Sequence, residues 1–179
     1  STLKWKYYYP LEKSYQISGK WDFKIIKGGP DNGYLKKINS LTSWTEWDEK
    51  MAAFSGTAQY KIKFNRPSEH EGPWLLKLGD VRESAKVWLN DQYLGTLWSN
   101  PYQLNIENLK KGENILRIQV TNSGSNRIKA KEERGEKWKN FYNINIVGLD
   151  YQPFDATKLD VLDGGLLEAP LLIPLGISE

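Results

Sequence analysis

Hydrophobic and polar residues alternate with a period of two along much of the chain between residues 20 and 120. In KWDFKI (20–25), Trp21, Phe23 and Ile25 fall on one side of an extended chain, and Asp22 and Lys24 fall on the other. Such alternation is typical of β-strands with one buried face. Similar patterns predict further strands, about nine in all, over residues 57–64, 73–80, 84–90, 102–106, 114–120, 142–147 and 165–175.

The segments between these strands carry recognisable signals. Asn90-Asp91 tolerates positive φ at both positions and predicts a two-residue hairpin turn. Residues 45–53 predict one or two helical turns, and the polar stretch 122–141 is an insertion that we expect to be partly helical. The pattern predicts an all-β fold: an antiparallel β-sandwich of the jelly-roll type. We expect one domain over 1–179, with a core at about 17–128 and closing strands at about 142–175.

Composition narrows the functional classes. The chain has 179 residues, no cysteine and a net charge of +3, with lysine and glutamate interspersed. We therefore expect neither a nucleic-acid partner nor a thiolate metal site, and no apolar run is long enough to span a membrane. No cofactor motif is present. Eight Trp, ten Tyr and five Phe fit either the core of a small sandwich or rings that stack on sugars.

Short motifs in order along the chain resemble those of a known family. They are LTSWTE (41–46), FSGTA (54–58), LGDV (78–81), LG (94–95) with Trp98 and Pro101, GEN (112–114), TN (121–122) and NR (126–127). The set is similar to the sugar-binding-like, or galactose-binding-like, jelly roll of family 2 glycoside hydrolases. It resembles in particular the C-terminal β-sandwich of family 106 α-L-rhamnosidases. The likeness covers residues 17–128 well and 163–175 loosely.

The resemblance implies a role without catalysis. In such enzymes the catalytic carboxylates lie in a separate (β/α) barrel, so this chain would be a non-catalytic, carbohydrate-binding-like domain of a rhamnosidase-like glycoside hydrolase. Its expected partners are that catalytic domain and an oligo- or polysaccharide. The sequence departs from the family pattern at Asn90-Asp91, at residues 123–125 and over 129–162.

The beginning of the chain bears on its location. The first residue is Ser, and no signal peptide precedes it. We take the chain as a processed mature form or a piece of a longer protein, and we expect it to belong to a periplasmic or extracellular bacterial enzyme of polysaccharide degradation.

The resemblance also suggests a sugar-contacting edge. In family 2 enzymes the loop after the central hairpin lies at the edge of the sandwich that faces the barrel. Here that loop contains Trp98, Ser99 and Asn100, which become the first candidates for sugar contacts. The alternative is that the Trp98 ring packs on Pro101 and the sheet edge, as a structural residue.

Three further residues are candidates. Alternation puts Trp88 on the face opposite Val87 and Leu89, where it is either covered by another segment or an exposed stacking platform. Trp47, three residues after Trp44, is a second candidate ring. Arg127 could bond sugar hydroxyls or form a structural ion pair.

Catalysis by this chain alone is not expected. Its acidic residues stand in polar runs that are typical of solvated surface, whereas a glycosidase needs two carboxyl groups held at a defined separation. We expect no metal site in general. A structural calcium ion is conceivable in the loop GGPDNG (28–33), although its ligand spacing is not that of an EF-hand.

Two other functions stay open at this stage. A free-standing carbohydrate-binding module would need an exposed coplanar aromatic pair, for which Trp88 and Trp47 are the obvious members. A purely structural module would bind only its neighbouring domain, through a solvent-facing apolar patch without a cleft.

Overall fold

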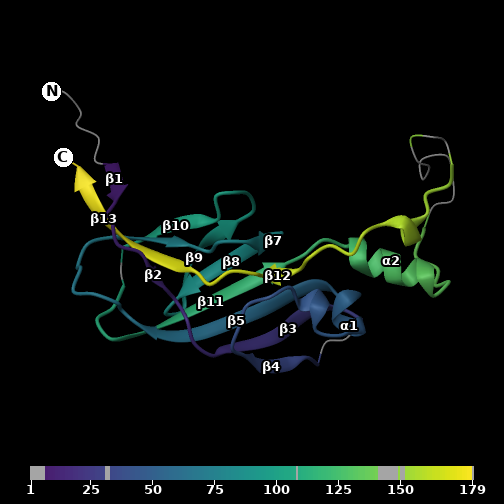
Figure 1. The fold of residues 1–179 in the computed structure, drawn as a ribbon, viewed down its shortest axis with the longest axis horizontal. Helices are drawn as coiled ribbons and strands as arrows, with labels where there is room; N and C mark the ends of the chain where they lie inside the picture. Colours follow the sequence, from purple (N-terminus) through teal and green to yellow (C-terminus); the bar gives the residue numbers. More distant parts are fainter. Residues whose placement is uncertain (1–6, 31–32, 108, 141–148, 150–151, 179) are drawn as a thin grey trace.

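The computed structural model describes residues 7–30, 33–107, 109–140, 149 and 152–178. Two antiparallel sheets pack face to face and enclose one hydrophobic core (Figure 1). The prediction of an all-β fold, an antiparallel β-sandwich, is confirmed. The predicted strand at 142–147 and residues 31–32 of the GGPDNG loop lie outside the described residues.

The larger sheet has six strands. Its order is β4-β3-β5-β11-β8-β9, with every neighbouring pair antiparallel. The strands are β3 (Trp21–Gly29), β4 (Leu35–Ile38), β5 (Ser55–Asn65), β8 (Ser84–Leu89), β9 (Gln92–Leu97) and β11 (Glu113–Thr121).

The second sheet places the C-terminal strand at its centre. β13 (Leu171–Ser178) pairs with β1 (Tyr7–Pro10) on one side and with β6 (Trp74–Lys77) on the other. β10 (Gln103–Ile106) continues beyond β6, and β2 (Tyr15–Gln16) pairs with β13. A short ladder joins β7 (Val81–Arg82) to β12 (Gly165–Leu166).

The apolar residues of the alternating pattern form the core, as predicted from the sequence. Trp21 and Phe23 of β3, Tyr60 of β5 and Leu116 of β11 are at most 2% exposed. Their neighbours along each strand face away from the core. The Asn90-Asp91 hairpin is confirmed, with φ values of 50° and 66°.

The helical elements lie at one end of the sandwich. A 3₁₀ turn η1 (Trp44–Glu46) and a single helical turn α1 (Glu49–Ala52) confirm the helical turns predicted over 45–53. Asp48 caps α1, because its carboxylate accepts from the Met51 backbone N–H at 2.8 Å. The helix α2 (Ser125–Glu133) and the turn η2 (Ala156–Lys158) lie beyond it, at the end of the molecule opposite the chain termini (Figure 1).

A clamp made of Ser43, Trp44 and Tyr60 holds residues 164–166 against the larger sheet. Ser43 Oγ accepts from the Gly164 N–H at 3.1 Å, and the Trp44 N–H donates to the Gly164 carbonyl at 3.0 Å. The buried Tyr60 hydroxyl accepts from the Leu166 N–H at 3.2 Å. The indole of Trp44 is fully buried against Gly164, where a Cβ atom would collide with the indole nitrogen.

We expect Gly164→Ala to lower the free energy of unfolding by about 2–3 kcal/mol, because the added methyl group forces the packed Trp44 ring out of place. Urea unfolding followed by circular dichroism measures this. Gly124→Ala is the matched control, because a Cβ atom there meets nothing closer than Ile128 Cδ1 at 3.9 Å. Equal stability of the two variants would contradict the clamp.

Burial raises the pKa of Tyr60 far above its ordinary value, since the ionised phenolate would lie in the core. A folded-state pKa above the unfolded one stabilises the protein fully below pH about 10 and loses that contribution as the pH rises further. We therefore expect the free energy of unfolding to fall above pH 10, by up to about 1.4 kcal/mol per pH unit. In Tyr60→Phe the fall should be shallower. Urea titrations from pH 8 to 11 test this, and identical slopes would refute it.

Candidate functional site

The loop after β9 presents the first candidate residues at the surface. Trp98 follows the last residue of β9, and its ring is 77% exposed. Ser99 and Asn100 are exposed beside it. The structural alternative, in which the Trp98 ring packs on Pro101 and the sheet edge, does not fit this exposure. Trp98 is therefore available to a ligand or to another domain.

A polar hollow of about 490 Å³ adjoins this loop. Asn100 and Tyr102 line one side of it, and Asp80, Arg82 and Glu83 line another. Arg82 donates to both carboxylate oxygens of Asp80, from Nε and Nη2, each at 2.7 Å. This hydrogen bond to the Asp80 carboxylate raises the pKa of Arg82, so the guanidinium stays charged and fixed in direction.

Tyr102 lines the hollow together with Asn100. Its hydroxyl donates to the Glu83 carbonyl at 2.6 Å. Desolvation raises the pKa of Tyr102, and the nearby charges of Glu83 and Asp80 add to the effect. The phenol is thus neutral at ordinary pH. The hollow combines amide, guanidinium, carboxylate and hydroxyl groups, which are suited to hydrogen bonding with sugar hydroxyls.

The described carboxyl groups with a displaced pKa all shift downward. A hydrogen bond from a neighbour is the leading cause in each case: from Lys111 to Glu71, from Arg134 to Glu136 and from Thr157 to Asp155. A general acid that protonates a glycosidic oxygen needs a raised pKa. None of these three groups is suited to that step.

Trp88 lies on the outer face of the six-stranded sheet, as alternation predicted. It is half-buried, and the rings and charges found against it belong to its own sheet. The Arg117 guanidinium lies 4.2 Å from the centroid of its ring, and the Tyr93 ring lies at 5.3 Å. Trp88 is thus one member of a surface cluster built from β8, β9 and β11.

Trp47 belongs to the edge of the core. Its ring lies 4.7 Å from Phe23 and 6.0 Å from Tyr34, and its Nε1 donates to Thr42 Oγ1 at 3.2 Å. Phe23 faces the core, whereas Trp88 lies on the outer face of the same sheet. Trp47 and Trp88 therefore cannot form the coplanar pair that a free-standing module would need.

Arg127 lies on α2, away from the other candidates. Its guanidinium packs on Gly29, where a Cβ atom would come within 3.1 Å of Cζ. In the part of the chain that the structure describes, no ion pair holds Arg127. The structural ion pair considered as its alternative role is therefore not what fixes this side chain. The six candidates occupy four separate places, and only Trp98, Ser99 and Asn100 lie together.

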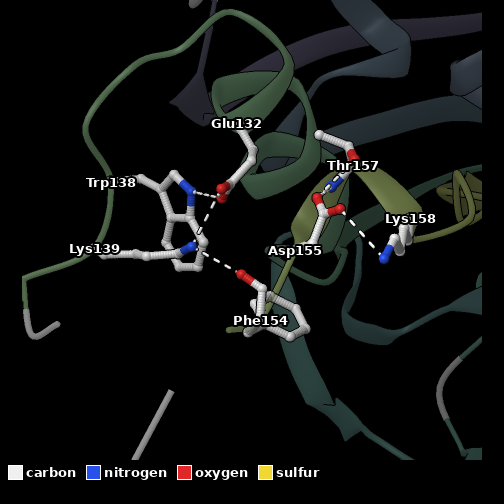
Figure 2. A network of polar contacts seen from close by, with 7 residues as sticks. All are labelled: Glu132, Trp138, Lys139, Phe154, Asp155, Thr157 and Lys158. Atoms are coloured by element: carbon white, nitrogen blue, oxygen red, sulfur yellow. Dashed lines mark hydrogen bonds and ion pairs between the residues drawn. The ribbon is translucent and has the colours of Figure 1, made fainter. Parts of the chain in front are cut away.

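The polar insertion forms an arm around α2 (Figure 2). The Glu132 carboxylate accepts from Trp138 Nε1, and it accepts from Lys139 Nζ at 3.2 Å. Lys139 also donates to the Phe154 carbonyl at 2.8 Å. The prediction that this insertion is partly helical is confirmed by α2. The charged side chains of Glu132 and Lys139 pair with each other inside the arm.

The structure also bears on metals and membranes. Over residues 7–30, 33–107, 109–140, 149 and 152–178, no group of three or more acidic or histidine side chains could hold a metal ion. The GGPDNG calcium hypothesis stays a prediction, because residues 31–32 fall outside this set. No helix within the same residues is long and apolar enough to cross a membrane.

Sequence reasoning missed the hollow beside Asn100. Asp80, Arg82 and Glu83 come together through the two-residue strand β7, which is too short for periodicity to reveal. The available signal was GDVRES (79–84), in which three charged residues interrupt the run between two predicted strands.

The profile of the family described as "Glycosyl hydrolase 2 galactose-binding domain-like" matches residues 31–153. The chain belongs to this family. The sequence-based resemblance is thereby confirmed for the family 2 domain.

Relatives of this family-2-like domain are much longer than the chain. A protein of Formosa agariphila named "Putative beta-glucuronidase" is 34% identical over 124 residues, which are 65% of this chain and 10% of that protein. The rhamnosidase of Novosphingobium sp. PP1Y matches with a TM-score of 0.69 and 24% identity, over 96% of this chain and 16% of that one. A β-galacturonidase of Eisenbergiella tayi matches with a TM-score of 0.59 and 16% identity, over 92% of this chain and 24% of that one. The structural matches establish a shared fold.

Proposed function

We propose that this chain is a non-catalytic sandwich domain of a glycoside hydrolase. In this proposal it packs against a catalytic domain and presents the Trp98–Asn100 edge to the sugar. One observation carries the proposal. Trp98 belongs to the motifs shared with the family, yet its ring is 77% exposed and has no packing role in the core. Trp44 of the same set of motifs is fully buried.

The edge would act by contact and orientation. The apolar face of a pyranose can stack on the Trp98 ring, and Asn100 and the fixed Arg82 guanidinium can bond its hydroxyls. The remaining polar groups of the hollow lie next to these. The proposal also extends to the sugar that the whole enzyme would recognise. Because the 34% identical relative is named as a β-glucuronidase, a β-glucuronide is the first substrate to test.

In the enzyme that carries this domain, we expect Trp98→Ala to raise KM about five- to tenfold, because a stacked apolar surface is lost. The measurement uses the 4-nitrophenyl glycosides of β-glucuronate, β-galacturonate and α-rhamnose. Tyr7→Ala is the control, since it removes a ring that is 63% exposed on β1, far from the edge. A KM that Trp98→Ala leaves unchanged on every hydrolysed substrate would refute the contact.

A purely structural role predicts a different pattern. If the edge only holds the domains together, Trp98→Ala lowers the melting temperature of the whole enzyme and leaves KM intact. Thermal unfolding of the same variants therefore separates the two roles.

A further inference from the structure

The face of the six-stranded sheet that is turned away from the core is strongly cationic. Its side chains come from alternate positions of β3, β4, β5, β8 and β11. Six of them are cations and two are carboxylates: Lys24, Lys37, Lys61, Lys63, Lys86 and Arg117 against Asp22 and Glu113. The whole chain has a net charge of only +3, so this one face holds more than the entire excess of positive charge.

The two carboxylates do not neutralise this face. Asp22 lies 4.0 Å from Lys37, and Glu113 lies 2.9 Å from Lys63. Lys24, Lys61 and Lys86 form no ion pair with any described residue. Lys61 stands directly opposite Arg117 in the β5–β11 ladder and directly opposite Asp22 in the β3–β5 ladder. The like charges of Lys61 and Arg117 repel each other, Asp22 offsets part of that repulsion, and a bound anion would offset more of it.

An open hollow of about 490 Å³ lies on this cationic face. Four lysines and one carboxylate border it, together with Leu35 and the mostly buried Gln59: Lys24, Lys36, Lys37, Lys61 and Asp22. The Gln59 amide is already oriented, because its Oε1 accepts from Gln119 Nε2 at 3.3 Å. Leu35 is 77% exposed and offers an apolar surface beside the charges.

Aromatic rings extend the same face beyond Arg117. Register places Lys61, Arg117, Trp88 and Tyr93 in one row across β5, β11, β8 and β9. The Arg117 guanidinium stacks on Trp88, and Tyr93 is 52% exposed. Neighbouring strands lie about 4.8 Å apart, which is close to the length of one sugar unit. Each step along the row therefore brings one charged or aromatic group to a ligand that crosses the strands.

We propose that this outer face binds an anionic polysaccharide. Its carboxylate or sulfate groups pair with Lys24, Lys61 and Arg117, and a sugar ring lies on Trp88 and Tyr93. The Gln59 amide bonds hydroxyl groups in the hollow. This site is separate from the Trp98–Asn100 edge and does not depend on it. The face combines cations with an amide, and its two rings, Trp88 and Tyr93, lie together at one end. Single-stranded nucleic acid binds through a series of rings on which successive bases stack, so this arrangement favours a charged glycan.

The test measures binding of the purified chain to polygalacturonate by isothermal titration calorimetry at low ionic strength. Polygalacturonate in its methyl-ester form is the matched ligand, because it has the same backbone without charge. We expect the acid form to bind and the ester to bind at least about tenfold more weakly. The affinity for the acid form should fall as salt is added, since counterions compete for the lysines.

Charge-matched variants locate the site. Lys24→Gln combined with Lys61→Gln should weaken binding about tenfold. Lys13→Gln combined with Lys110→Gln removes the same charge from exposed positions elsewhere and should leave the affinity within about twofold. All four lysines are exposed, so the variants should fold, as circular dichroism can verify. Trp88→Ala should weaken binding as well, with an unchanged dependence on salt.

Three results would overturn the proposal. The first is equal affinity for polygalacturonate and its methyl ester. The second is equal loss of binding in the two double variants, which would show only an effect of net charge. The third is competition by duplex DNA at equal phosphate and carboxylate concentrations that is as strong as competition by free polygalacturonate. That result would identify a general polyanion surface instead of a polysaccharide site.

Discussion

The clamp of Ser43, Trp44 and Tyr60 on residues 164–166 is the constraint on which the sandwich depends. The strand that follows this clamp, β13, lies at the centre of the second sheet, between β1 and β6. Residues 164–166, which are anchored on the first sheet, therefore come shortly before the central strand of the second. The clamp satisfies the Gly164 and Leu166 N–H groups with buried hydroxyls, whereas the buried indole nitrogen of Trp44 has no hydrogen-bond partner among the described residues.

This arrangement shows which structural role several of the family motif residues have. LTSW supplies Ser43 and Trp44, and the closing GGLL supplies the backbone that they hold. In the same way the Asn114 side chain of GEN bonds Asn90 and the Lys110 backbone, which joins the hairpin turn to the next loop. These motif residues build the fold, and their presence does not identify a ligand. The surfaces that could recognise a sugar lie among side chains that the core does not use.

Periodicity predicted the core strands because each of them has one buried face. It did not find β9, where Gly95 and a bulge opposite Val87 and Trp88 interrupt the alternation. It also missed β1, all four residues of which are exposed at the edge of a sheet. For the candidate site, the pattern placed Trp88 on the correct face. It could not give the exposure of Trp98, because that residue lies beyond the end of its strand and its environment depends on the turn that follows.

The attachment of the α2 arm has a consequence for how such domains diversify. Asn126 accepts from the Leu162 N–H at 2.8 Å and donates to the Leu162 carbonyl at 2.7 Å, so one side chain replaces a rung of backbone pairing. These bonds join the chain that enters the arm at Asn126 to the chain that leaves it at Leu162, and the Arg127 guanidinium packs on Gly29 of β3 beside them. We expect the segment between Asn126 and Leu162 to tolerate changes of length or composition better than the strands do, because these bonds hold its two ends together. The sandwich would then serve as a common scaffold, and the inserted segment is a place where that scaffold can be adapted to different neighbouring domains.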